Sequence, residues 1–213
     1  MRARRKTELM YPVKTPALLK PLAKDLLWHI EDVEKKIYLT FDDGPTPGVT
    51  EEILKRLSRY QALATFFCLG KNIQAHTALY SHILTQGHQV GNHTYDHPDG
   101  WKTSNYSYFK NVLRANEFCN SPLFRPPYGR ITPGQAAALK RRYTIVMWDV
   151  LSADFDSDIS AEQCLKNVID HAHSGSIVVF HDSIKAHKKM LYALEGVLDH
   201  FSGLDYEFHS LPS

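Results

Sequence analysis

Residues 37–45 read Ile-Tyr-Leu-Thr-Phe-Asp-Asp-Gly-Pro, and this stretch constrains the chain more than any other. Apolar residues at every second position indicate a half-buried strand, which Gly44-Pro45 ends. Two carboxylates, Asp42 and Asp43, therefore stand at the carboxyl end of a strand. Because adjacent like charges beside a core are costly unless a cation or donor compensates them, the pair predicts a metal ion, an arginine or both. The alternative is a turn whose carboxylates bond nearby amides.

Short apolar segments alternate with helical patterns along the rest of the chain. The expected strands cover residues 37–41, 64–69, 88–91, 123–124, 143–148, 177–181 and 206–208. The expected helices cover residues 78–86, 106–119, 133–141, 161–172 and 188–200, with a further helix that begins at about Thr50 as its N-cap. Seven strands alternating with helices predict parallel pairing through right-handed crossovers. An open doubly wound sheet and a closed barrel fit equally well, and in both the chemistry belongs at the carboxyl ends of the strands.

The chain has 213 residues, of which 43% are hydrophobic, so it can bury one sizeable core. We expect a basic arm with a short amphipathic helix in residues 1–35 and a single domain in residues 36–213. That helix, at residues 17–30, is expected to dock onto the domain, and membrane contact through residues 1–30 is the alternative. The net charge is +2, and residues 1–36 hold nine Lys/Arg against five Asp/Glu. The body thus carries no cationic excess, which argues against nucleic acid as a partner.

The three cysteines, Cys68, Cys119 and Cys164, are odd in number and widely spaced. This pattern is typical of buried thiols in a reducing compartment rather than of a disulfide framework or a cysteine-zinc site. The basic start of the chain lacks the apolar core of a signal peptide, because prolines and lysines interrupt it. No apolar run is long enough to span a membrane. We therefore expect a cytoplasmic protein, and a monomer.

Polar clusters follow several of the expected strands. His93 and His97 are four residues apart, so on one helical turn both imidazoles would face the same way and share a metal ion with Asp43. Arg125 opens a rigid Arg-Pro-Pro-Tyr-Gly turn that can hold its guanidinium toward a carboxylate. His181 closes the apolar run Ile-Val-Val-Phe, a position suited to proton transfer.

Five motifs occur in the order found in one known family. They are Thr40-Phe-Asp-Asp-Gly-Pro45, His93-Thr-x-x-His97, Arg125-Pro-Pro-Tyr-Gly129, the segment from Trp148 to Phe155, and Val179-Phe-His181. From Lys36 to about Asp182 the chain resembles the polysaccharide deacetylase family, also called the NodB-homology domain or carbohydrate esterase family 4. The resemblance implies an α/β fold, a distorted (β/α) barrel with about seven parallel strands. It also implies a divalent metal, zinc before cobalt, nickel or manganese, and an N-acetylated carbohydrate as substrate.

The resemblance also implies roles for individual residues. Asp43, His93 and His97 would bind the metal; Asp42 would be the general base and His181 the general acid; Arg125 would orient Asp42; the Tyr128 amide would contact the oxyanion; Asp154 would pair with His181. Asp149 is a rival for the role of Asp154. Pro127, Tyr128, Phe155 and Val179 would contact the substrate. Phe155 and Val179 stand where the family usually has Trp and Leu, so the acetyl pocket is expected to differ in shape.

Other functions remain open at this point. The same site would serve an O-acetyl esterase of the xylan type, and a carbohydrate-binding protein could keep the cleft with little catalysis. Two histidines and a carboxylate also suit a non-haem iron oxygenase, although the alternating strand and helix pattern does not match the antiparallel folds of that class. The main hypothesis is a metal-dependent hydrolase that removes N-acetyl groups from a glycan or an amino sugar.

Overall fold

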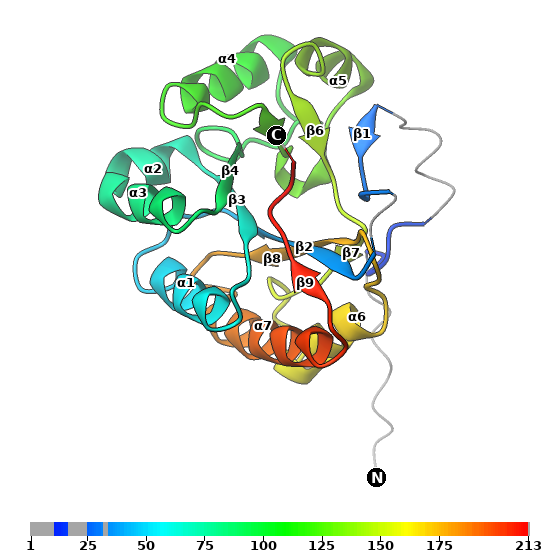
Figure 1. Ribbon diagram of the computed structural model, residues 1–213. Helices are drawn as coiled ribbons and strands as arrows, with labels where there is room; N and C mark the ends of the chain where they lie inside the picture. The colour runs from blue at the N-terminus through cyan, green and yellow to red at the C-terminus, as the bar shows by residue number, and fades with distance from the viewer. Residues whose placement is uncertain (1–10, 17–24, 32–33, 213) are drawn as a thin grey trace.

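A computed structural model describes residues 11–16, 25–31 and 34–212, and Figure 1 shows a curled sheet with helices around it. The nine strands of the described residues pair in parallel, in the order β1-β6-β5-β4-β3-β2-β8-β7, with β9 beside β2. They are β1 (Leu26–Leu27), β2 (Lys36–Asp42), β3 (Ala64–Cys68), β4 (Gln89–Asn92), β5 (Leu123–Phe124), β6 (Thr144–Val146), β7 (Val150–Leu151), β8 (Ile177–His181) and β9 (Glu207–Phe208).

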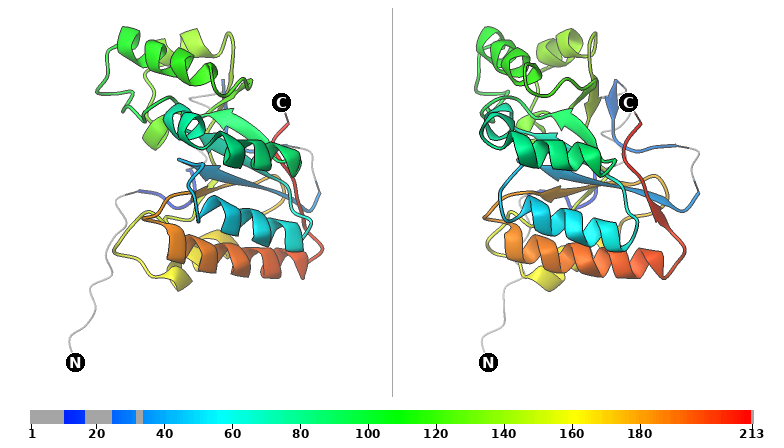
Figure 2. Two further views of the ribbon diagram at one scale, coloured as in Figure 1. Left: turned by 90° about the vertical axis from the view of Figure 1, so that its left-hand side faces the viewer. Right: turned by 60° about the vertical axis from the view of Figure 1, so that its left-hand side comes forward.

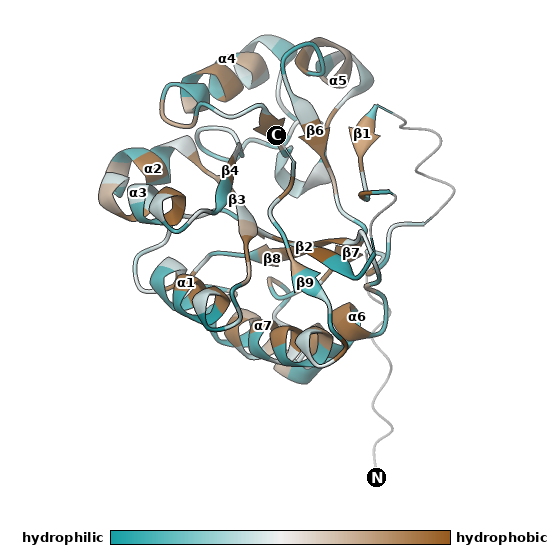
Figure 3. Ribbon diagram, in the orientation of Figure 1, coloured by the Kyte–Doolittle hydropathy of each residue, from teal (hydrophilic) through white to brown (hydrophobic). Residues whose placement is uncertain are grey.

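Helices cover the outer side of the sheet, and α1 and α7 lie side by side against it (Figure 2). The described helices are α1 (Thr50–Arg59), α2 (Gly70–Ala75), α3 (Thr77–Thr85), α4 (Asn105–Asn116), α5 (Pro133–Leu139), α6 (Ala161–Ile169) and α7 (His187–Ser202), with a 3-10 turn η2 (Pro127–Gly129). In α1 the buried residues Ile53, Leu54 and Leu57 share one side. Hydrophobic and hydrophilic positions alternate around α1 and α7 in Figure 3, as expected for helices with one buried face.

The two faces of β2 belong to different parts of the core. Ile37, Leu39 and Phe41 are fully buried in the cluster between the sheet and the helices. Tyr38 belongs instead to an inner cluster with residues of β3, β5, β6 and β8. Because side chains alternate along a strand, Thr40 and Asp42 share the inner face with Tyr38. The strand therefore directs the first aspartate into the interior of the curled sheet.

All seven expected strands are present, so the predicted α/β architecture with parallel pairing is confirmed. The sequence did not predict β1, β7 or α2. The helix expected at residues 17–30 is wrong over Leu26–Leu27, which form β1 and pair with β6, while residues 17–24 lie outside the described residues. Leu27 O accepts a hydrogen bond from Met147 N at 2.7 Å, so these leucines serve an edge strand. Thr50 is not the N-cap of α1 but its first residue.

Cys68, Cys119 and Cys164 are buried and unpaired, as expected. Among the described residues, no helix combines the length and the apolar content that crossing a membrane requires.

Candidate active site

The polar residues that follow the strands meet in one pocket of about 430 Å³, a size typical of small-ligand sites. Asp42 ends β2, His93 follows β4 and His181 ends β8, so the pocket lies at the carboxyl ends of the strands. The described residues that line it are Tyr11, Asp42, Asp43, His93, His97, Tyr128, Gly129, Arg130, Trp148, Leu151, Phe155, Val179, His181 and Lys185.

Asp43, His93 and His97 form a group whose ligand atoms all lie within 4.8 Å of one another. Asp43 Oδ1 is 3.8 Å from His93 Nε2 and 3.3 Å from His97 Nε2. These separations suit three bonds of about 2.0–2.2 Å to one common ion, the range for nitrogen and carboxylate ligands of zinc. The three residues expected to bind a metal are thus brought together, and their donor set fits a divalent cation.

Both His93 and His97 are neutral imidazoles, so each has a ring nitrogen with a lone pair that could bind a metal ion. His93 Nδ1 lies 2.8 Å from Arg125 O, and a carbonyl only accepts, so this nitrogen carries the proton and leaves Nε2 free toward Asp43. Burial lowers the pKa of His93, and burial together with the neighbouring His93 lowers the pKa of His97 to about 4. The imidazoles are therefore neutral near pH 7. Burial raises the pKa of Asp43, a cost that a bound cation would offset.

The histidines do not share a helical turn, which corrects that part of the expectation. The segment after β4 is irregular, and His97 has a left-handed φ of 70°. His97 N donates to Thr94 Oγ1 at 3.1 Å, and Asn111 of α4 accepts from Tyr95 N at 2.7 Å. Thr94 within the segment and Asn111 outside it fix the loop, so the rings of His93 and His97 come together without helical periodicity.

Asp42 and Arg125 form a buried ion pair inside the curled sheet. Arg125 has no exposed surface, and its Nη1 donates to Asp42 Oδ1 at 2.8 Å and to Thr40 Oγ1 at 2.7 Å. Burial alone would raise the pKa of Asp42, but Arg125, with smaller effects from His93 and His181, holds that pKa below its usual range. Asp42 is therefore an ionised carboxylate with one oxygen bound and the other available.

Asp154 holds His181 on the other side of the pocket. Its Oδ1 is 2.7 Å from His181 Nδ1, and its Oδ2 accepts from the backbone N of His181 at 2.7 Å. Burial alone would lower the pKa of His181, but the Asp154 carboxylate raises it to about 9. His181 is thus protonated near pH 7 and can donate a proton. Asp149, the rival at the sequence level, does not take this place.

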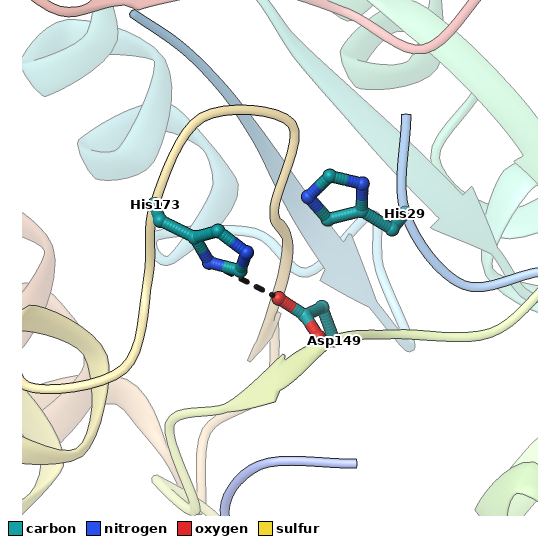
Figure 4. Close-up of side chains that lie close together, drawn as sticks. All are labelled: His29, Asp149 and His173. Atoms are coloured by element: carbon teal, nitrogen blue, oxygen red, sulfur yellow. Dashed lines mark ion pairs between the residues drawn. The ribbon is translucent and has the colours of Figure 1, made fainter. Parts of the chain in front are cut away.

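Asp149 instead belongs to a second cluster, with His29 and His173, at the opposite ends of the strands (Figure 4). It precedes β7, and its Oδ2 lies 3.6 Å from His173 Nδ1. Lys14 Nζ is 3.5 Å from the same Asp149 oxygen and 3.3 Å from the same His173 nitrogen. The ammonium group therefore already supplies a positive charge at this cluster, which makes it a poorer metal site than the pocket.

Three of the residues expected to contact the substrate, Tyr128, Phe155 and Val179, line the pocket. Tyr128 has a left-handed φ of 59°, is 60% exposed, and its ring lies 4.5 Å from that of His97. Phe155 lies 5.1 Å from the His181 ring, and together with Val179 it forms part of the pocket wall. Pro127 is buried and is not among the described residues that line the pocket, and its contact with a substrate stays a prediction.

Sequence reasoning missed several residues that shape the site. Tyr11 and Lys185 line the pocket but lie in no motif, because only the folded chain brings them there. Leu151 also lines the pocket, and it was not singled out within the motif from Trp148 to Phe155. Near Asp43, Asp182 is buried and accepts a hydrogen bond from Thr50 Oγ1 at 2.6 Å. A Cβ on Gly44 would lie 2.1 Å from Asp182 Oδ2, so only glycine fits between the two aspartates and this third carboxylate. The position of Asp182 directly after His181 was the sequence signal that could have placed it near the site.

The parallel α/β half-barrel with a two-histidine, one-aspartate cluster at its strand ends places the protein among α/β proteins with a candidate metal site. The model of the family described as polysaccharide deacetylase matches residues 29–145. The chain belongs to this family, as the sequence resemblance indicated. The match includes Asp42, Asp43, His93, His97 and Arg125, whereas Asp154 and His181 lie beyond it.

Individual relatives agree with this assignment. A peptidoglycan-N-acetylglucosamine deacetylase of Bacillus cereus is 33% identical over 186 residues, which are 84% of this chain and 67% of the relative. A chitooligosaccharide deacetylase of Azorhizobium caulinodans is 29% identical over 176 residues, 79% of this chain and 83% of the relative. A solved peptidoglycan N-acetylglucosamine deacetylase superposes with a TM-score of 0.85 at 28% identity and covers 93% of this chain and 95% of its own.

The fold alone does not decide activity in this family. A solved pseudoenzyme of carbohydrate esterase family 4 from Bacillus anthracis shares the fold, with a TM-score of 0.74 at 20% identity over 86% of this chain and 66% of its own. The function of this chain must therefore be argued from its own polar residues.

Proposed function

We propose that this protein is a metal-dependent hydrolase that removes N-acetyl groups from an N-acetylated glycan or amino sugar. The observation that carries the proposal is the meeting of Asp43, His93 and His97 within 4.8 Å, between an ionised Asp42 and a protonated His181. A metal site flanked by a base and an acid is the arrangement that amide hydrolysis needs. The relatives named for deacetylating peptidoglycan and chitooligosaccharides support the substrate class.

Asp43, His93 and His97 would hold a divalent metal, zinc in the first place, which when bound acts as a Lewis acid and activates water. The free oxygen of Asp42 accepts the proton of the attacking water, while Arg125 keeps the other oxygen in place. The Tyr128 N–H would donate to the carbonyl oxygen of the acetyl group, which becomes the oxyanion when water attacks the carbonyl carbon. His181, held through Nδ1 by Asp154, gives its proton to the departing nitrogen as the C–N bond breaks. The products are acetate and a free amine.

The residues of the site and the fold argue against two of the alternatives, a binding protein without catalysis and a non-haem iron oxygenase. A binding protein without catalysis would be expected to lack a proton-transfer residue, yet Asp42 and His181 both stand beside the metal ligands. The sheet is parallel, whereas non-haem iron oxygenases of this ligand type usually have antiparallel folds, so the fold does not support that alternative. The O-acetyl esterase remains the second candidate, because Val179 and Phe155 stand where the family usually has Leu and Trp.

The test is an acetate-release screen with the metal-loaded protein on chitooligosaccharides, peptidoglycan, N-acetylglucosamine and acetylated xylan. Asp42→Asn should abolish release while metal content stays near that of the unaltered protein, because Asp42 is not one of the three ligands. Asp170→Asn, on the exposed end of α6, is the matched control and should leave both unchanged. Full activity of Asp42→Asn would refute the base assignment. Release only from acetylated xylan would favour the esterase.

A further inference from the structure

A strap of residues 11–15 lies along β7, the last strand of the sheet. Lys14 forms an antiparallel bridge with Val150, and Leu151 N donates to Val13 O at 2.8 Å. Thr15 is 6% exposed, and its Oγ1 donates to Trp148 O at 2.7 Å. Backbone pairing therefore fixes the strap beside Trp148 and Leu151, two residues of the pocket wall.

Tyr11, at the start of the strap, reaches the pocket itself. Its ring lies 5.2 Å from the ring of Phe155, which in turn lies 5.1 Å from the ring of His181. Its hydroxyl donates to Asp156 Oδ2 at 2.5 Å. The ring of Phe155 thus contacts both the ring of His181, the proposed general acid, and the ring of Tyr11. Because the hydrogen bond to Asp156 already fixes the hydroxyl, the Tyr11 ring would lose little conformational entropy when a ligand binds against it.

We propose that Tyr11 is a substrate-contacting residue whose ring packs against a sugar of the acetylated glycan and sets a preference for oligosaccharides. A sugar ring presents C–H groups on its faces, and a fixed aromatic ring offers a large apolar surface to them at low entropic cost. Tyr11 lies outside residues 29–145, the part of the chain that the family model matches. The inference rests on the proposed function, since it names the substrate contact of the same site.

The experiment compares Tyr11→Ala and Tyr11→Phe with the unaltered protein on N-acetylchitotetraose and on 4-nitrophenyl acetate, an acetyl ester without a sugar. For Tyr11→Ala, the ratio of kcat/KM on the oligosaccharide to kcat/KM on the ester should fall about tenfold, mainly through KM. Tyr11→Phe keeps the ring and should stay within about threefold of the unaltered protein. The matched control is Tyr106→Ala, because Tyr106 is a 79% exposed tyrosine of α4 outside the pocket. This variant should leave kcat/KM on both substrates unchanged.

A binding measurement separates this inference from the proposed function. In the Asp42→Asn background, calorimetry with N-acetylchitotetraose should show about a tenfold weaker Kd when Tyr11 is also changed to Ala. An unaltered protein that releases no acetate from any substrate refutes the proposed function, while the calorimetry still reports on Tyr11. An active protein whose Tyr11→Ala variant keeps the same ratio and the same Kd overturns the inference. So does an equal loss on both substrates, which would mean that Tyr11 only supports Phe155 and His181.

Discussion

Removing one partner of the buried ion pair between Arg125 and Asp42 should strongly destabilise the protein. Arg125 is fully buried, Asp42 is 4% exposed, and they are joined at 2.8 Å. Arg125 also donates to Met147 O at 2.8 Å and stacks over Phe67 at 4.1 Å. Changing Arg125 to Met keeps much of the volume but leaves the Asp42 carboxylate buried without its cation. Removing one partner of a buried pair costs about 3–5 kcal/mol, so we expect unfolding free energy to fall by that amount near neutral pH.

The measurement is urea unfolding of the four proteins of a double-mutant cycle, Arg125→Met and Asp42→Asn alone and together. The cycle is run after chelation, so that metal binding does not contribute. The double variant has no unpaired buried charge, and the coupling between the two positions should be at least about 2 kcal/mol. An additive cycle, in which Arg125→Met costs the same beside Asn as beside Asp, would refute the reasoning.

The pH dependence of stability tests the role of the ion pair independently, because the unaltered protein and Arg125→Met should respond to pH in opposite directions. In the unaltered protein the pKa of Asp42 is lowered, so its contribution to stability is present above the ordinary carboxyl pKa and is lost as pH falls through the folded value. In Arg125→Met only burial remains as the main influence, which raises the pKa, so that variant is destabilised as pH rises instead. The difference in stability between the two proteins should therefore narrow as pH falls from about 7 toward the ordinary aspartate pKa of about 4. A constant difference across this range would contradict the argument.

Three further predictions concern other groups of the fold and site. Asp154→Asn removes the charge that raises the pKa of His181 to about 9, so the alkaline limb of the kcat/KM profile should move to lower pH, and an unmoved limb would reject this partner. His97→Ala should weaken zinc binding, measured by competition with a chelating dye, by more than the roughly 10–100-fold typical of a residue behind the ligands. His88 accepts from Ala64 N at 3.2 Å, and burial lowers its pKa to about 4, so its neutral form contributes stability that is lost as pH falls from about 6.5 toward 4. His88→Asn keeps an acceptor without titrating, and its urea midpoint should fall less over that range.

Much of the site could be predicted because a parallel sheet collects the carboxyl ends of its strands at one edge. Asp42, His93, Arg125 and His181 each follow or end a strand of the sheet, and the apolar pattern is clear for the strands of Asp42 and His181. Their convergence then follows from topology, without knowledge of any side-chain contact. The helices with one apolar face, such as α7, could be predicted for the related reason that their period differs from that of the strands.

The features that the sequence did not predict depend on partners distant in the chain. Leu26–Leu27 form a two-residue strand only because β6 offers an edge, so their own spacing was misleading. Asp149 and Asp154 lie five residues apart with similar surroundings in sequence, yet they face opposite ends of the strands. Tyr11 reaches the pocket only because the strap pairs with β7. Local patterns carry no information on such pairings, since their energy comes from tertiary contacts.

The register between β2 and β8 links the fold to the proposed chemistry. Asp42 is the direct partner of His181 across these two parallel strands. Thr40 Oγ1 donates to Val178 O at 2.8 Å, and Asp182 N donates to Asp42 O at 2.7 Å, so contacts on both sides of the pair hold this alignment. A slip of one residue would turn Asp42 to the face of β2 that packs against the helices and bring an apolar side chain inside. The apolar alternation of β2, which first identified the strand, therefore also places the proposed base beside the proposed acid.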